Sequence, residues 1–85
     1  MRDFVKRVQA GRDFYPEFFF HVLHGASSKL CYHVSTRDLR GKNIFFTMRK
    51  NSDGAWKIID APKVPDWIFF FETKLAEAIV ENSKA

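Results

Sequence analysis

In the middle of the chain, apolar and polar side chains alternate in three separate stretches. The stretches are 30–36, 43–49 and 55–60, and each keeps the period of two that is typical of a β-strand with two different faces. The connections between them contain Gly41 and Gly54, and glycine supplies the positive φ that tight turns require. The pattern therefore predicts an antiparallel β-meander.

A further apolar stretch at 14–24 fits either of two structures. Pro16 can begin a helix that Gly25 ends, or the aromatic residues can form a strand that is buried on both faces. The aromatic content favours the strand, which would bring the sheet from three strands to four. The small and polar residues at 25–28 predict a turn or loop after it.

The segment 65–82 predicts one amphipathic helix, because apolar residues recur there every three or four positions. These residues are Ile68, Phe71, Leu75, Ala78 and Ile79. Pro65 suits the first helical position, since its missing N–H would have no partner there. Asp66 places negative charge in the first turn, where the helix dipole favours it. This helix is expected to cover one face of the sheet.

The same segment carries a second stripe on its other side. The stripe consists of Phe69, Thr73, Ala76 and Val80. Because a sheet offers the helix only one face, this stripe needs another partner. Two partners fit, namely the N-terminal segment of the chain and a second subunit.

The N-terminal stretch 2–10 predicts a short helix with Phe4, Val5 and Val8 on one side. Together the elements predict an α+β fold: a small antiparallel β-meander of three to four strands packed on a C-terminal amphipathic helix, with a short N-terminal helix. The length of 85 residues leaves room for one domain. That single domain is expected to span 1–85.

The chain is rich in aromatic residues for its size. It contains 10 Phe, 2 Trp and 2 Tyr, whereas a chain this short buries only about 60% of its unfolded surface. Some of these rings are expected on a surface shared with another chain. Together with the second helical stripe, this surplus predicts a non-catalytic protein-interaction module that self-associates as a homo-oligomer or binds a protein partner. A densely aromatic monomer core is the other interpretation.

The sheet face away from the helix offers an alternative function, single-stranded nucleic-acid binding. It is expected to carry His33, Phe45, Arg49 and Lys57 on neighbouring strands. Sheet-based single-strand binders stack bases on exposed rings while cations meet phosphates. The order of strands followed by a helix is similar to that of transcriptional-coactivator-like single-strand-binding domains, an analogy of architecture alone. The net charge of +4 is mild, and the N-terminal helix or a second subunit could instead cover this face.

Three cations surround the turn at Gly41. Arg37, Arg40 and Lys42 predict a small anion site in which backbone N–H groups assist. Charged turns are common on protein surfaces, so a solvated turn is the competing interpretation.

Histidine and cysteine suggest a further alternative, a small zinc-binding domain. A helix over 16–24 would place His21 and His24 on adjacent turns, and the next strand places Cys31 and His33 on one face, so that four ligands converge. The spacing matches no familiar zinc pattern. The competing interpretation is histidines at the edge of the core and a small buried thiol, and no metal or cofactor is expected.

No catalytic motif is present, and neither an enzyme nor a small-molecule substrate is expected. Asp38, Asp53 and Asp60 fall in or beside turns, where aspartate hydrogen-bonds the backbone. The chain contains no glycine-rich phosphate loop and no nucleophile elbow.

The first ten residues lack a continuous apolar stretch and Cys31 is the only cysteine, which predicts a soluble cytoplasmic protein without a secretory signal or membrane span.

Overall fold

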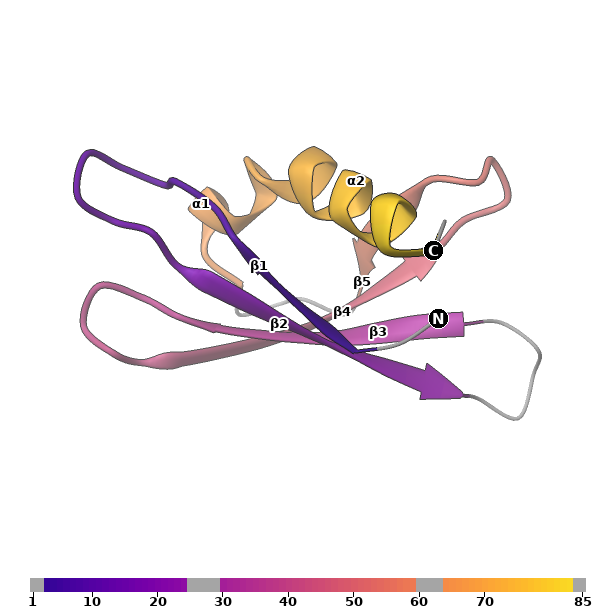
Figure 1. Cartoon of the computed structure of the whole chain (residues 1–85), viewed down its shortest axis with the longest axis horizontal. Coiled ribbons are helices and arrows are strands. Elements are labelled where there is room, and N and C mark those ends of the chain that lie inside the picture. Colours follow the sequence, from indigo (N-terminus) through magenta and orange to yellow (C-terminus); the bar gives the residue numbers. More distant parts are fainter. Residues whose placement is uncertain (1–2, 25–29, 60–63, 84–85) are drawn as a thin grey trace.

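The computed structural model describes residues 3–24, 30–59 and 64–83. Five antiparallel strands form one sheet in the order of the chain. They are β1 (Phe4–Arg7), β2 (Glu17–His24), β3 (Leu30–Arg37), β4 (Asn43–Lys50) and β5 (Trp56–Ile59). Two helices, α1 (Asp66–Phe69) and α2 (Glu72–Ser83), follow the strands and lie on the same side of the sheet (Figure 1). Neither of these described helices is long and apolar enough to cross a membrane.

The three strands predicted in the middle of the chain are confirmed as β3, β4 and β5, with ends that differ by one residue. The strand interpretation of 14–24 is also confirmed, since β2 lies within it. Gly41 and Gly54 have φ angles of 79° and 83°, as their turns require. The turn predicted at 25–28 lies outside the described residues.

The prediction of a short N-terminal helix is wrong, and so is the prediction of three to four strands. Residues 4–7 form β1, which pairs with β2 and makes the sheet five-stranded. A helix this short is unstable by itself, whereas the edge of β2 offers unpaired backbone N–H and C=O groups. The ring of Phe4 also stacks on that of Phe20, with centroids 4.3 Å apart. Strand pairing therefore satisfies two backbones and adds an aromatic contact.

The segment predicted as one helix consists of two. Phe70 and Phe71 separate α1 from α2, and the N–H of Phe71 donates to the carbonyl of Ile68 at 3.0 Å. A bond over three residues belongs to a tight 3₁₀ turn and interrupts the α-helical pattern. Pro65 has an extended ψ of 150°, so the first helical residue is Asp66 and not the proline.

The core lies between the helices and one face of the sheet. Ile68, Leu75 and Ile79 of the helices are fully buried, and they pack against sheet residues that point toward them. The buried sheet residues include Phe18, Phe20, Tyr32, Val34, Ile44, Phe46, Met48 and Trp56. Thr36 is buried among them, and its Oγ1 donates to the carbonyl of Glu17 at 2.9 Å, which satisfies the hydroxyl group.

Candidate functional site

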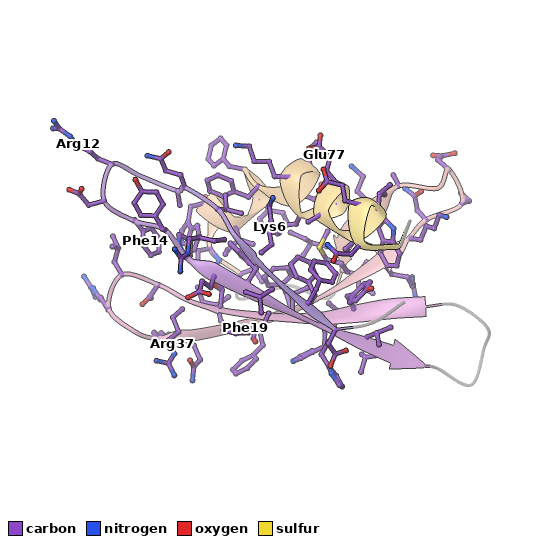
Figure 2. All side chains as sticks on the ribbon, in the orientation of Figure 1. Lys6, Arg12, Phe14, Phe19, Arg37 and Glu77 are labelled. Atoms are coloured by element: carbon purple, nitrogen blue, oxygen red, sulfur yellow. The ribbon has the colours of Figure 1, made fainter. Side chains whose placement is uncertain are left out.

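The side of the sheet opposite the helices, which we term the open face, is covered by no described segment (Figure 1). The N-terminal segment that was one candidate to cover it extends the sheet instead. Because successive strand residues point to opposite sides, every second residue projects from this face. These residues include Val5, Arg7, Phe19, His21, Leu23, Cys31, His33, Ser35, Arg37, Phe45, Thr47, Arg49 and Lys57. Figure 2 shows Phe19 and Arg37 extending on this side, away from α2.

Two phenylalanine rings lie exposed on the open face. Phe19 has an exposed fraction of 51% and Phe45 one of 59%. The ring of His33 stacks on that of Phe45, with centroids 5.9 Å apart and planes 16° from parallel. We refer to the His33–Phe45 pair as the stacking platform. Phe19 stacks on no other ring among the described residues, and about half of its surface is accessible to a ligand.

Phe19, Ser35 and Phe45 form one row across three strands. Ser35 is paired with Phe19 on β2 and with Phe45 on β4. Serine is much smaller than phenylalanine, so the row is low in the middle and high at both ends. A hollow of about 290 Å³ lies on the β1–β3 side of this row. The side chains around it include Val5, Phe19, His21, His33 and Ser35.

The structure brings together three of the four residues predicted for nucleic-acid binding. His33, Phe45 and Arg49 all project from the open face. Lys57 is paired with Arg49 across β4 and β5, but its Nζ lies 3.4 Å from Oε1 of Glu72 on the helix side. Lys57 therefore lies at the border of the open face, and its charge is partly balanced by Glu72.

Two further arginines border the open face at the other end of the strands. The guanidinium of Arg7 lies 3.6 Å from Oε1 of Glu17, so this charge is shared with a carboxylate. The Nε of Arg37 donates to Oδ1 of Asn43 at 3.1 Å. Because the amide of Asn43 is neutral, this bond orients Arg37 without cancelling its charge. Arg37 was predicted only as part of the anion site.

A carboxylate connects β1 to a histidine of the open face. The Oδ2 of Asp3 lies 2.8 Å from Nδ1 of His21, and its Oδ1 accepts from the backbone N–H of Val22 at 2.9 Å. Asp3 thus continues the hydrogen bonding of the β2 edge just before β1 begins. The contact between Oδ2 and Nδ1 orients the imidazole of His21, which is paired with His33 across β2 and β3.

The convergence of zinc ligands predicted for a helix over 16–24 does not arise, because that segment contains β2. His21 and His33 project from the open face, and Cys31 lies half-buried one step further along β3. The side chain of His24 lies outside the described part of the chain. Among the side chains that are described, no group of three or more His, Cys, Asp and Glu residues is placed to hold a metal ion.

The turn between β3 and β4 already contains a carboxylate at the predicted anion site. Oδ1 of Asp38 accepts from the backbone N–H groups of Arg40 and Lys42 at 2.9 and 2.8 Å. The predicted anion site near Arg37, Arg40 and Lys42 depended on help from backbone N–H groups of this turn, and these two already have an acceptor. The three cations are exposed, so an external anion would depend on their side chains alone.

The second stripe of the C-terminal helical segment is partly exposed. Phe69 and Val80 have exposed fractions of 44% and 41%, Thr73 is exposed and Ala76 is half-buried. The last three border a groove of about 410 Å³ between α2 and residues 54–57. The N-terminal strand does not cover this stripe. It lies beside a different side of α2, the one that carries Lys74 and Ala78.

Phe19 is a site residue that the sequence pattern did not single out. Phe18 and Phe20 alternate with Phe19 and His21, and this period of two is the pattern that would place Phe19 on the same strand face as His21. It could be interpreted only once the segment was known to be a strand with a single covered face.

No protein-family model matches the chain, and comparisons with curated proteins and with solved structures find no significant match. The function of the open face must therefore be argued from its own geometry and charge.

Proposed function

We propose that this protein is a non-catalytic binding module for single-stranded nucleic acid and that the open face is its binding surface. The observation that supports this proposal is the combination of two exposed rings, Phe19 and Phe45, with the exposed cations Arg37 and Arg49. Bases stack on aromatic rings, and cations neutralise the phosphates between them. A face that is aromatic in the centre and cationic at its borders matches both parts of a nucleotide.

A single strand fits this surface better than a duplex does. In a duplex the bases are already stacked on each other and paired, so the rings of Phe19 and Phe45 would have no base face to contact. In a single strand the bases can turn outward and lie against protein rings. The proposal therefore includes a preference for unpaired over paired nucleic acid.

The expected affinity follows from the number of contacts. A base stacked on an aromatic ring contributes about 1–3 kcal/mol, so two rings contribute about 2–6 kcal/mol. A micromolar complex requires about 8 kcal/mol, and the phosphate contacts of Arg37, Arg49 and Lys57 must supply the remainder. We therefore expect micromolar binding at low salt that weakens strongly as the salt concentration rises.

Fluorescence anisotropy with a labelled single strand of about ten nucleotides tests the proposal. We expect log K to fall with log salt by about 0.7 for each phosphate contact. The duplex of the same sequence is the matched control and should bind more weakly. Phe45→Ala should weaken binding on the order of tenfold without changing the salt dependence, because the ring contacts a base and carries no charge. No detectable binding in about 50 mM salt would contradict the proposal.

A second candidate function, self-association through the helical stripe, is supported by a different observation. Phe69 and Val80 expose large apolar side chains at the two ends of the stripe. The spacing of the stripe is four, three and four residues, which reads the same in both directions. A second copy that packs its α2 antiparallel on this one about a two-fold axis would place Thr73 opposite the partner's Ala76, with Phe69 of α1 beyond the end of this contact. This second candidate uses the face of the helices away from the sheet and leaves the open face accessible.

A further inference from the structure

We propose that the open face holds one nucleobase in a slot between Phe19 and the stacking platform, with Ser35 as its floor. The inference rests on the proposed function and names the subsite at which a base binds. It is carried by three observations: the exposed ring of Phe19 on β2, the stacked rings of His33 and Phe45 on β3 and β4, and the small Ser35 that is paired with both Phe19 and Phe45.

The width of the slot suits a single base. Phe19 and Phe45 lie on β2 and β4 and are both paired with Ser35 of β3, so their backbones are two strand spacings apart, about 9.5 Å. Stacked rings have centroid separations of about 4.5–7 Å. One base between two rings therefore needs two such separations, about 9–14 Å, and the spacing of the two backbones lies at the lower end of this range. The slot has room for one base and is too narrow for two.

The two walls differ in how well they are preorganised. His33 and Phe45 are already stacked on each other, with an interplanar angle of 16°. A ring held in this way loses little further freedom when a base lies against it. Phe19 is exposed and has no ring partner among the described residues. Phe19 is therefore the wall that can adjust to the base, and the platform is the wall that orients it.

The floor and one end of the slot carry polar groups. Ser35 lies between the walls, and the hollow of about 290 Å³ extends from it toward His21 and Asp3. The hydroxyl of Ser35 can both donate and accept a hydrogen bond. The imidazole of His21 is oriented by its contact of 2.8 Å with Asp3. Because these groups can hydrogen-bond the edge of a base, the slot selects a base over an apolar ring.

Filling the floor is the sharpest test of the slot. Ser35→Leu adds a branched side chain between Phe19 and Phe45 without removing either ring or any cation. The probe is a single strand of about ten nucleotides with one fluorescent 2-aminopurine in place of a base. Stacking of 2-aminopurine on protein rings quenches its fluorescence. We expect the original protein to quench the probe, and Ser35→Leu to abolish the quenching and weaken binding on the order of tenfold.

Ser52→Leu is the matched control, because it makes the same substitution at an exposed serine in the turn between β4 and β5, outside the open face and the hollow. This variant should bind and quench as the original protein does. The salt dependence should be the same in all three proteins, since no phosphate contact is changed. Phe19→Leu should also abolish quenching, and it provides the test if Ser35→Leu fails to fold.

The possible outcomes separate the slot from the proposed function. If the oligonucleotide binds with normal salt dependence but Ser35→Leu and Phe19→Leu quench as the original protein does, the slot is disproved and nucleic-acid binding stands. Equal losses in Ser35→Leu and Ser52→Leu also disprove the slot, because the substitution would then have the same effect outside the slot. If the original protein does not bind the single strand, both the slot and the proposed function are disproved.

Discussion

The backbone N–H of Ile58 donates to Oε2 of Glu72 at 3.0 Å. Ile58 lies in β5, which forms one edge of the sheet, and Glu72 is the first residue of α2. Unpaired N–H groups at a sheet edge can pair with another chain, and the carboxylate of Glu72 satisfies this one from within the same molecule. The contact also attaches the start of α2 to the sheet at the point where the two helices separate.

Glu72→Ala is expected to lower the free energy of unfolding by about 1–3 kcal/mol, because it leaves the half-buried N–H of Ile58 without its acceptor. Urea denaturation followed by circular dichroism measures this change. Glu77→Ala is the matched control, since Glu77 is an exposed glutamate of the same helix, and its denaturation midpoint should stay the same. Equal midpoints for both variants would show that the Glu72 contact contributes nothing to stability.

Arg49→Ala is expected to weaken binding of a single strand and to reduce the salt slope by about 0.7, the amount that belongs to one phosphate contact. Lys50→Ala removes the same charge from the adjacent residue, which is paired with Trp56 and points away from the open face. Lys50→Ala should keep the original slope. Anisotropy titrations at several salt concentrations distinguish the two. The same loss of slope in both variants would mean that net charge, and not the open face, determines binding.

Phe69→Asp is expected to leave a folded monomer, because the structure shows no N-terminal helix that packs on Phe69 within the described residues. If the helical stripe self-associates, analytical ultracentrifugation should show an oligomer for the original protein and a monomer for this variant. Phe70→Asp is the control, since Phe70 is 82% exposed and lies beside the stripe and not in it. A strictly monomeric original protein at about millimolar concentration, the weak limit of specific association, would rule out self-association.

Stability should also fall at alkaline pH because of one buried tyrosine. Burial, and to a lesser extent the negative charge of Asp3, raises the pKa of Tyr32 above its ordinary value of 10.0. Below pH 10.0 the phenol is protonated in both the folded and the unfolded chain, so its contribution is fully present. Above that pH the unfolded chain releases the proton first, and the free energy of unfolding falls by up to about 1.4 kcal/mol per pH unit until the pH passes the raised pKa.

Tyr32→Phe tests this pH dependence. Denaturation at several alkaline pH values should show a shallower loss of stability in the variant than in the original protein, whatever its stability at neutral pH. The comparison of slopes matters here, because removal of the hydroxyl group can also change the absolute stability. Identical slopes would show that Tyr32 does not cause the alkaline loss.

Several elements could be predicted from local pattern because the pattern had only one interpretation. In 43–49 the apolar residues Ile44, Phe46 and Met48 alternate with residues that face away, and all three are buried as expected. The positive φ at Gly41 and Gly54 is likewise a local property. Leu75 and Ile79 are buried at the helical spacing that the pattern indicated.

The N-terminal stretch was ambiguous because two periods fit it. Phe4, Val5 and Val8 share one side of a helix, but Phe4 and Val8 also share one face of a strand. The structure places Val8 in the core and leaves Val5 exposed, which is the strand pattern. The choice between helix and strand depends on the free edge of β2, and the sequence of the N-terminal stretch contains no information about that edge.

The candidate site was likewise predicted in part from local pattern and decided in part by the strand order. The pattern placed His33, Phe45 and Arg49 on one face, but it did not show that this face is open or that Phe19 belongs to it. That required the five-stranded order, because only when β1 pairs with β2 does the N-terminal segment leave the sheet uncovered.

The alternation of side chains determined which residues of each strand and helix share a face, because that depends on backbone geometry alone. Only the tertiary structure decided which strand lies beside which, where Glu72 attaches α2 to β5, and which face remains accessible. These features depend on contacts between residues far apart in the chain. The free energies of such contacts cannot be predicted from any local stretch of sequence.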